Sequence, residues 1–171
     1  MHSVPIGYEI SATPLQIAMS YAAIANGGFL LKPYIVERIE KHDDTIIKNQ
    51  RNTKKRILSQ SNSEKLGLML SHTVENGSAK SAAIDGWNVA GKTGTSKKLI
   101  DGKYSEKEFI SSFVGYFPYE NPQLLCLIII DSPDASRNLH WGGISAAPVF
   151  KSVMDRVINI DKSITVSRSN K

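Results

Sequence analysis

Residues 86–95 read GWNVAGKTGT and admit two incompatible interpretations. The spacing from Gly86 to Thr93, Gly-x-x-x-x-Gly-Lys-Thr, satisfies the phosphate-binding pattern of nucleotide hydrolases. Such a loop works when a buried strand leads into it and a helix follows it, so that backbone N–H groups point at the phosphates. The alternative is one extended strand whose side chains alternate between two faces. The two interpretations predict different folds and different roles for Lys92.

The flanking residues favour the strand. The preceding SAKSAAID (78–85) has no β-branched apolar run that would form a buried strand. After Lys92, the glycines at 94 and 102 would break a helix within about three turns. The run LLCLIIID (124–131) ends on Asp131, as the magnesium-binding strand of a nucleotidase would, but a buried strand that ends in a turn explains it equally well. A P-loop nucleotide-binding protein is therefore kept only as the less favoured alternative.

Length and composition narrow the class of protein. The 171 residues suffice for one domain with a hydrophobic core. The net charge is +5, but lysine and arginine are scattered and no stretch interleaves them with aromatic residues, which argues against nucleic-acid binding. Cys126 is the only cysteine, so we expect a small buried hydrophobe and no internal disulfide. No apolar run reaches the ~20 residues that cross a bilayer, and residues 1–11 lack signal-peptide character. We therefore expect any anchor or export signal to lie outside this chain.

Two helices and a hairpin are predicted in the first half. Within residues 11–28 the sequence predicts a helix that Thr13 caps and that Gly27 and Gly28 end. Residues 30–41 alternate between apolar and polar and predict a strand, with which 45–50 would pair back as a hairpin. A second helix is predicted over 59–77. Its apolar positions would be Leu66, Met69, Leu70 and Thr73.

The second half predicts an antiparallel sheet. After the extended segment at 87–95 we expect a polar, turn-rich loop over 96–108 that bends at Asp101 and Gly102, and then strands over 109–117 and 123–131. A C-terminal helix over 142–160 would pack against this sheet. Its apolar face would carry Val149, Phe150, Val153, Met154 and Val157. The order of elements gives an α+β fold with an antiparallel sheet flanked by helices, and residues 161–171 form a polar tail after the domain at 1–160.

Five blocks resemble the class B penicillin-binding proteins, in the same order and at similar spacing. The blocks are IGYEISATPLQIAMSYAAIANGG (6–28), VAGKTGTSKK (89–98), FISSFVGYFP (109–118), NPQLLCLIIIDSP (121–133) and WGGISAAPVFKSV (141–153). The first block is more similar to the division-specific, septal enzymes than to the elongation-specific ones. The resemblance implies a penicillin-binding transpeptidase fold, similar to the serine β-lactamases, of which this chain would be the C-terminal part.

The resemblance also implies a site and its residues. Three motifs line one cleft in this family: Ser-x-x-Lys with the nucleophile, Ser-x-Asn, and Lys-Thr-Gly. The chain contains no Ser-x-x-Lys, and its Ser-x-Asn, Ser136 to Asn138, follows the Lys-Thr-Gly instead of preceding it. By resemblance Lys92 is the catalytic lysine, and the substrate-binding residues are Thr93, Gly94 and Thr95. The chain alone is expected to be inactive.

The implied activity is septal peptidoglycan D,D-transpeptidation by a serine enzyme without cofactor or metal. Its partners would be the stem peptide ending in D-Ala-D-Ala, β-lactam antibiotics, the missing N-terminal part of the transpeptidase domain and other division proteins, but not nucleic acid. The enzyme would be anchored in the cytoplasmic membrane with its catalytic domain on the outer, periplasmic face. A class D β-lactamase or β-lactam sensor domain also carries Lys-Thr-Gly and stays open as an alternative.

Several polar and aromatic residues receive structural interpretations. His140, next to Trp141, is far in sequence from the other histidines, and no metal-binding spacing appears. The acidic pairs Asp43–Asp44 and Glu106–Glu108 are interpreted as solvated turns rather than acid/base pairs. We expect three aromatic residues to pack against or cap the hairpin of the last two strands: Tyr116, Phe117 and Tyr119.

Overall fold

The computed structural model describes residues 10–42, 46–49, 53–161, 163 and 164. The first half contains helix α1 (Pro14–Ala25), four short strands and helix α2 (Gln60–Glu75). The second half contains three long strands and helix α3 (Gly142–Ile160). The strands are β1 (Phe29–Leu31), β2 (Arg38–Glu40), β3 (Ile46–Lys48), β4 (Thr53–Arg56), β5 (Ala90–Ile100), β6 (Lys103–Phe117) and β7 (Leu124–Asp131), and two 3-10 turns are η2 (Lys80–Ala82) and η3 (Ala135–Arg137).

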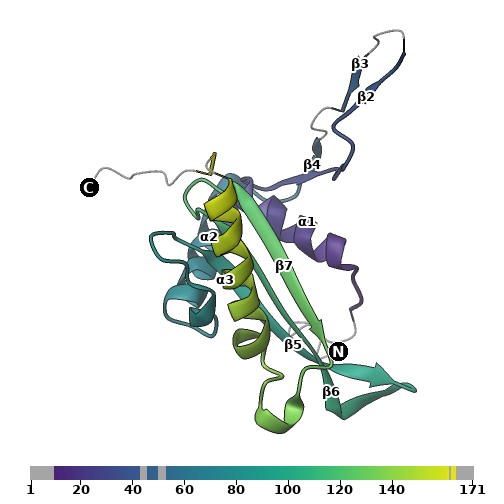
Figure 1. Ribbon diagram of the computed structural model, residues 1–171, viewed down its shortest axis with the longest axis vertical. Helices are drawn as coiled ribbons and strands as arrows, with labels where there is room; N and C mark the ends of the chain where they lie inside the picture. Colours follow the sequence, from purple (N-terminus) through teal and green to yellow (C-terminus); the bar gives the residue numbers. More distant parts are fainter. Residues whose placement is uncertain (1–9, 43–45, 50–52, 162, 165–171) are drawn as a thin grey trace.

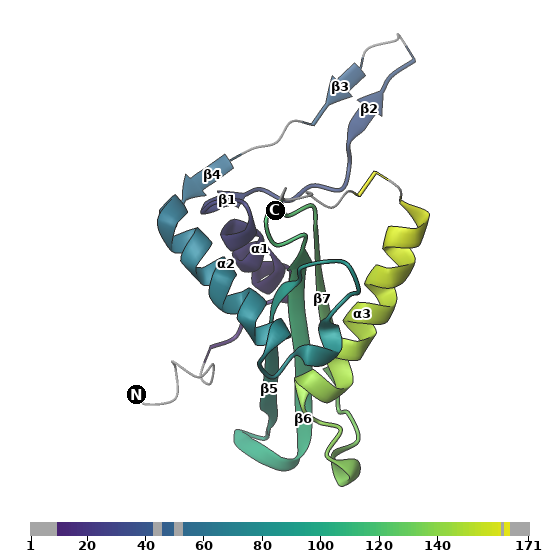
Figure 2. The ribbon, with the colours of Figure 1, turned by 90° about the vertical axis from the view of Figure 1, so that its left-hand side faces the viewer.

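A three-stranded antiparallel sheet in the order β5-β6-β7 forms the centre of the fold. Helix α3 lies along one face of this sheet, and α1 and α2 lie against the other (Figures 1 and 2). The prediction of an α+β fold with an antiparallel sheet flanked by helices is therefore confirmed. Among the described residues, strand β5 is at an edge of this sheet and pairs with β6 along one side only.

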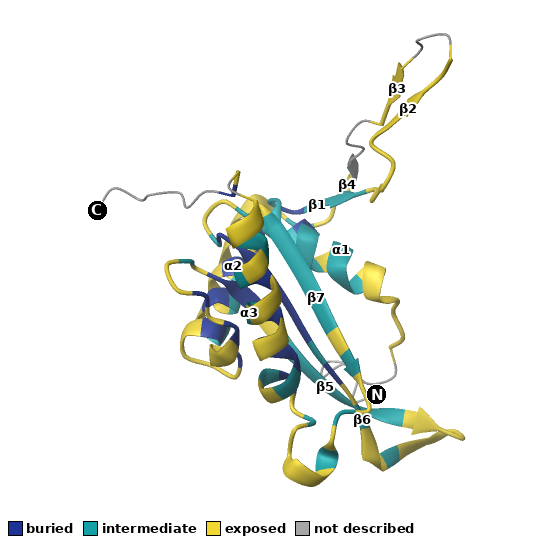
Figure 3. Ribbon diagram, in the orientation of Figure 1, coloured by how far each residue is buried: buried dark blue, intermediate teal, exposed yellow. Residues whose placement is uncertain are grey.

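The hydrophobic core fills the space between α3 and the sheet. Phe113 and Phe117 point from β6 toward Phe150 of α3, and all three are fully buried. The Phe150 ring meets Phe113 edge to face at 4.9 Å and Phe117 at 6.4 Å between ring centroids. Figure 3 shows the buried C-terminal half of β6 between the helices. Cys126 of β7 is half-buried and packs against this core, as predicted.

Helix α1 begins and ends as its sequence predicts. The Thr13 side chain accepts a hydrogen bond from the backbone N–H of Gln16, whose side chain in turn accepts from the backbone N–H of Thr13. This reciprocal pair satisfies two backbone donors at the start of the helix. After Ala25, Gly27 and Gly28 take positive φ values of 81° and 99°, which end the helix at little steric cost.

The predicted buried face of α2 is only partly right, because Leu66, Leu70 and Thr73 are half-buried and none of the predicted residues is fully buried. The helix buries a stripe of small residues against the sheet, and Met69 in contrast is 65% exposed. Gly67 shows why small residues face this side, because a Cβ there would lie 2.9 Å from the Tyr119 ring and 3.0 Å from the Tyr116 hydroxyl. Small residues let α2 approach the sheet closely. The buried residues of α2 are Ser63, Gly67, Ser71 and Val74.

Helix α3 confirms part of its predicted face. Phe150 and Met154 are buried, but Val149 and Val153 are 40% and 37% exposed. The buried side is completed by Ala146 and Ala147 on the preceding turn. Just after the helix, Ile164 also packs against the core.

The loop predicted over 96–108 is wrong, because both strands continue through it. The β5–β6 ladder runs on to the pair Ile100 and Lys103, with a register shift near Lys98. Asp101 and Gly102 form the predicted bend, with φ values of 49° and 77°. The polar composition resembled a loop because this end of the ribbon is largely exposed to solvent.

Cross-strand ion pairs link the strands of this polar ribbon. Lys97 pairs with Glu106 at 2.6 Å, and Lys98 lies 2.8 Å from Asp131 and 3.5 Å from Glu108. Glu106 and Glu108 therefore lie on β6 in ion pairs, not in the solvated turn that the sequence suggested. A hydrogen bond from Lys98 holds the pKa of Asp131 below its usual value. Asp131 thus has a structural partner at the end of β7.

The single strand predicted over 30–41 is two strands with different partners. Strand β1 pairs with β4, whereas β2 pairs with β3 in the register Arg38 to Lys48. The predicted hairpin is confirmed, and it projects from the rest of the structure (Figure 1). The residues between β1 and β2 leave the ladder because no strand lies beside them in the described part of the chain. Asp43 and Asp44 lie outside the described residues.

Candidate active site

The GKTGT segment is part of a β-strand. Within β5, Lys92 is opposite Val114, and Thr95 is opposite Ser111 on β6. The ladder begins at Ala90, three residues later than predicted, because Trp87 instead forms an isolated bridge with Ile84. No helix begins directly after Lys92, since β5 continues to Ile100. This backbone is incompatible with a phosphate-binding loop, so the nucleotide-binding alternative is excluded.

The strand separates the motif residues onto two faces. Thr93 and Thr95 share the α3 side of the sheet, since they pair with Phe113 and Ser111, whereas Lys92 is on the opposite face. The Lys92 ammonium is exposed and donates a hydrogen bond of 2.9 Å to the carbonyl oxygen of Thr93. Gly94 shares the face of Lys92, where a Cβ would collide with the Ser112 hydroxyl. The four predicted site residues therefore serve two surfaces of one strand.

A pocket of about 400 Å³ opens beside Thr93 and Thr95. Its walls come from β5, from the connection after α2 together with η2, and from Trp141 with the first turn of α3. Lys80 is the only charged residue among the described residues that line it. The lining residues are Gly77, Ser78, Lys80, Ser81, Thr93, Thr95, Trp141, Gly142, Gly143 and Ile144.

Both threonine hydroxyls are held by neighbours. Thr95 Oγ1 accepts a hydrogen bond of 3.0 Å from the backbone N–H of Gly142, the first residue of α3. Thr93 Oγ1 lies 3.0 Å from the hydroxyl of Ser78. A hydroxyl has one proton and can also accept, so Thr95 keeps its proton available for an acceptor in the pocket. The start of α3 adds the partial positive charge of a helix N-terminus.

Two glycines allow α3 to begin this close to the motif. A Cβ on Gly142 would lie 2.5 Å from the carbonyl oxygen of Gly94 and would also collide with the carbonyl of Ser112. A Cβ on Gly143 would collide with the carbonyl oxygen of Ser78. All three obstructing atoms belong to the backbone and cannot move aside by changing a rotamer. Any larger residue would push α3 away from the pocket.

We expect the substitution Gly142→Ala to destabilise the protein by about 1–3 kcal/mol, the usual cost of overpacking. The helix would have to move away from β5, so the bond from the Gly142 N–H to Thr95 would also weaken. Thermal denaturation of the purified protein measures the change. Ser145→Ala alters the same turn without adding an atom and serves as the control. Equal melting temperatures for the two variants would contradict this account of the glycine.

His140 and Trp141 lie at the entry to α3. The His140 ring stacks on Phe109 at 4.3 Å and contacts Trp141 at 4.8 Å between centroids. No group of three potential metal ligands occurs among the described residues. The Ser136–Asn138 segment lies in and after η3, where Ser136 bonds to Asp134, and none of its residues lines the pocket.

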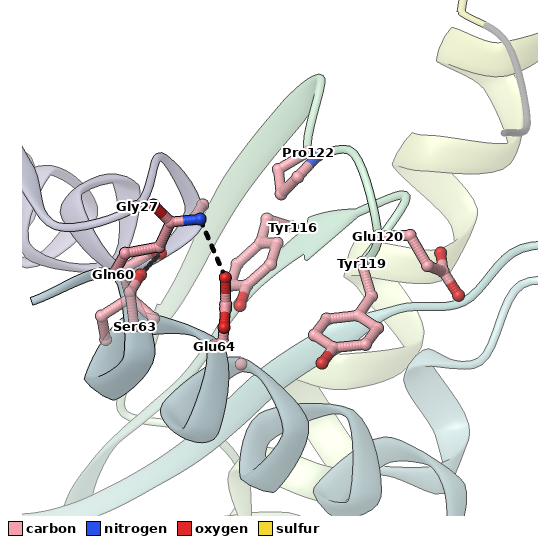
Figure 4. Close-up of a pocket in the computed structure, with 11 residues that line it drawn as sticks. Gly27, Gln60, Ser63, Glu64, Tyr116, Tyr119, Glu120 and Pro122 are labelled. Carbon is pink, nitrogen blue, oxygen red and sulfur yellow. Dashed lines mark hydrogen bonds between the residues drawn. The ribbon is translucent and has the colours of Figure 1, made fainter.

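A second hollow, of about 320 Å³, lies between α1, α2 and the turn after β6 (Figure 4). Tyr116 and Tyr119 extend toward α2 there, and Glu64 accepts a bond from Gln60. Burial raises the pKa of the Tyr116 phenol to about 12, and Tyr119 adds to the shift. Phe117 is fully buried in the core on the other face. The expectation that these aromatic residues pack at the hairpin is confirmed.

Sequence reasoning missed the walls of the first pocket. Ser78 belongs to the connection after α2, and Gly143 belongs to a helix that follows the motif by about fifty residues. A sequence pattern cannot detect Ser78 or Gly143 from their spacing to Lys92. They reach the pocket only because the strands pair antiparallel and α3 packs back against β5. The one available signal was the glycine pair at the start of the C-terminal helix. Among the residues that the structure describes, we find no helix with the length and apolar character required to span a bilayer.

Comparisons with known proteins agree with this geometry. Residues 1–155 match the family described as penicillin binding protein transpeptidase domain. Stage V sporulation protein D of Bacillus subtilis is 35% identical over 150 residues, covering 86% of this chain and 23% of that protein. A peptidoglycan D,D-transpeptidase FtsI homolog of Mesostigma viride is 35% identical over 170 residues, covering 91% of this chain and 28% of that protein.

A solved structure shows the same fold. Penicillin binding protein 3 of Mycobacterium tuberculosis, in a complex with aztreonam, is 26% identical, with a TM-score of 0.83 and coverage of 96% of this chain and 38% of that one. The chain thus spans about a quarter of the length of the curated relatives and little more than a third of the structure. The chain belongs to the penicillin-binding protein transpeptidase domain family, among class B proteins of the FtsI and PBP3 type.

Proposed function

We propose that this chain supplies the Lys-Thr-Gly wall of the active site in a penicillin-sensitive peptidoglycan D,D-transpeptidase. The observation that carries the proposal is the pocket beside β5, where the hydroxyls of Thr93 and Thr95 meet the first turn of α3. Hydroxyl donors, a helix N-terminus and the nearby Lys80 suit an anion. A stem peptide ending in D-alanine and a penicillin both present a carboxylate. Thr93 and Thr95 would bind that carboxylate.

Strand β5 also suits an extended peptide. Its outer edge is unpaired in the described part of the chain, so its backbone can add a substrate strand. Gly94 has no side chain to obstruct close approach of that strand. The exposed ammonium of Lys92, on the opposite face from the threonines, would support the proton network around the nucleophile. Lys92 and the threonines thus have separate tasks on one strand.

The nucleophile lies outside this chain. The sequence has no Ser-x-x-Lys, and nucleophilic catalysis needs a base beside the attacking hydroxyl. In the complete protein, meaning this chain joined to the upstream part of the transpeptidase domain, the serine would attack the penultimate D-alanine and expel the terminal one. An amine of a neighbouring strand would then take the acyl group. The isolated chain is expected to form no covalent penicillin adduct.

The proposal extends to septal wall synthesis. The relatives named FtsI and stage V sporulation protein D support a role in cell division or a related wall-building process. The complete protein would be anchored in the cytoplasmic membrane, would act on its outer face and would assemble with other division proteins.

Labelling with fluorescent penicillin tests this function. The complete protein is expected to be labelled and to release the acyl group slowly, as a transpeptidase does. Rapid hydrolytic turnover would contradict the proposal and favour the class D β-lactamase alternative. The isolated 171-residue chain is the matched control, because an adduct on it would show that the nucleophile lies within these residues.

A further inference from the structure

The proton arrangement around Thr93 differs from that around Thr95. Gly142 donates to Thr95 through a backbone N–H, which can only donate, so the Thr95 proton is directed elsewhere. The neighbour of Thr93 is the hydroxyl of Ser78, 3.0 Å away, and either oxygen can donate to the other. Only the arrangement in which Ser78 donates leaves the Thr93 proton for an anion. A carboxylate can only accept, and it therefore selects that arrangement.

The backbone fixes Ser78 at this position. The adjacent Ala79 is fully buried, and its N–H donates to the carbonyl oxygen of Thr73 at 3.1 Å. On the other side, the Ser78 carbonyl lies against Gly143, where no Cβ fits. The hydroxyl of Ser81 holds the same helix start through the Gly143 carbonyl. The connection between α2 and η2 is thus fastened to α3, with the Ser78 hydroxyl facing β5.

We propose that Ser78 is a positioning residue that directs the Thr93 hydroxyl proton toward the ligand carboxylate. This inference rests on the proposed function, since it presumes that Thr93 binds that group. Ser78 acts through Thr93 and takes no part in the acyl transfer. When Gly142 donates to Thr95 and Ser78 donates to Thr93, both threonine hydroxyls can donate their own protons to the carboxylate at the same time. Without Ser78, the Thr93 hydroxyl would rotate freely and lose part of its orientation.

The test measures acylation of the complete protein by benzylpenicillin and by its methyl ester, with the dissociation constant and the acylation rate constant determined separately. Ser78→Ala should weaken binding of benzylpenicillin about 3- to 10-fold, the effect of one hydrogen bond. For the ester, which lacks the negative charge, the dissociation constants of the wild type and of Ser78→Ala should be nearly equal. Ser78→Thr keeps the hydroxyl and should restore binding. The control Ser61→Ala removes an exposed hydroxyl on α2, away from the pocket.

Each result decides between distinct accounts. An equal loss for benzylpenicillin and its ester, or a lowered melting temperature with no rescue by threonine, would show that Ser78 supports the fold only and would overturn the inference. No loss for Ser78→Ala, in a wild type that is acylated normally, would also overturn it and would leave the proposed function standing. A wild type that is not acylated at all would overturn the proposed function and this inference with it.

Discussion

Replacing Lys92 with alanine in the complete protein is expected to lower the second-order rate constant of penicillin acylation about a hundredfold or more. A positive charge near the nucleophile supports its proton network and stabilises the oxyanion that develops in the transition state. Its loss should cost about 2–4 kcal/mol, comparable to one oxyanion-hole donor. The melting temperature should change little, because the Lys92 side chain is exposed and makes one hydrogen bond, to the Thr93 carbonyl. Stopped-flow measurement with a reporter penicillin gives the rate constant.

Lys97→Ala is the matched control for this substitution. It removes the same charge from the same strand, but Lys97 pairs with Glu106 on the polar ribbon beyond the motif. Its acylation rate should stay within about twofold of the wild type, since exposed ion pairs contribute little. Equal effects of the two substitutions would mean that Lys92 acts only through overall charge. Specific binding of magnesium ATP by the wild type would show that the motif had been assigned to the wrong chemistry.

Phe150→Ala is expected to lower the free energy of unfolding by about 3–5 kcal/mol, the usual range for a buried phenylalanine. Phe150 is fully buried and contacts Phe113 and Phe117 edge to face, so its removal leaves a cavity between α3 and the sheet. Urea denaturation of the complete transpeptidase domain measures the loss. Because α3 also positions Gly142 at the pocket, acylation should slow as well.

Val149→Ala provides the comparison on the same helix. Val149 is 40% exposed, so its truncation should cost less than about 1 kcal/mol. If Phe150→Ala proves no more costly than Val149→Ala, the phenylalanine cluster does not hold α3 on the sheet. If a strongly destabilised Phe150→Ala variant is still acylated at the wild-type rate, packing of α3 on the core does not affect the pocket, which would contradict the expected loss of acylation.

Sequence reasoning predicted the elements whose signals are local. The cap at Thr13 and the turn at Asp101 and Gly102 each depend on residues within a few positions, and the structure confirms both. The strand at Lys92 was also predictable, because the glycine at 94 argues against the helix that a phosphate loop needs. Secondary structure that depends on a few neighbouring residues can therefore be predicted from the sequence.

Other features depend on partners that are distant in sequence. Met69 was expected in the buried face of α2, but the close approach of Tyr116 and Tyr119 selects small residues such as Gly67 instead. Polar residues from Ser96 to Glu108 resemble a loop until cross-strand ion pairs are seen to join them. Ser78 reaches Thr93 only because the sheet and α3 fold back on the connection between them. These contacts are properties of the tertiary fold.

The central claim is that β5 forms the carboxylate-binding wall of a transpeptidase active site. A crystal structure of the complete protein acylated by benzylpenicillin tests it most directly. We predict that the carboxylate of the bound drug lies within about 3.2 Å of the Oγ1 atoms of Thr93 and Thr95, with the acyl bond on a serine outside these 171 residues. A carboxylate bound by other residues, or an acyl bond to a serine of this chain, would contradict the account.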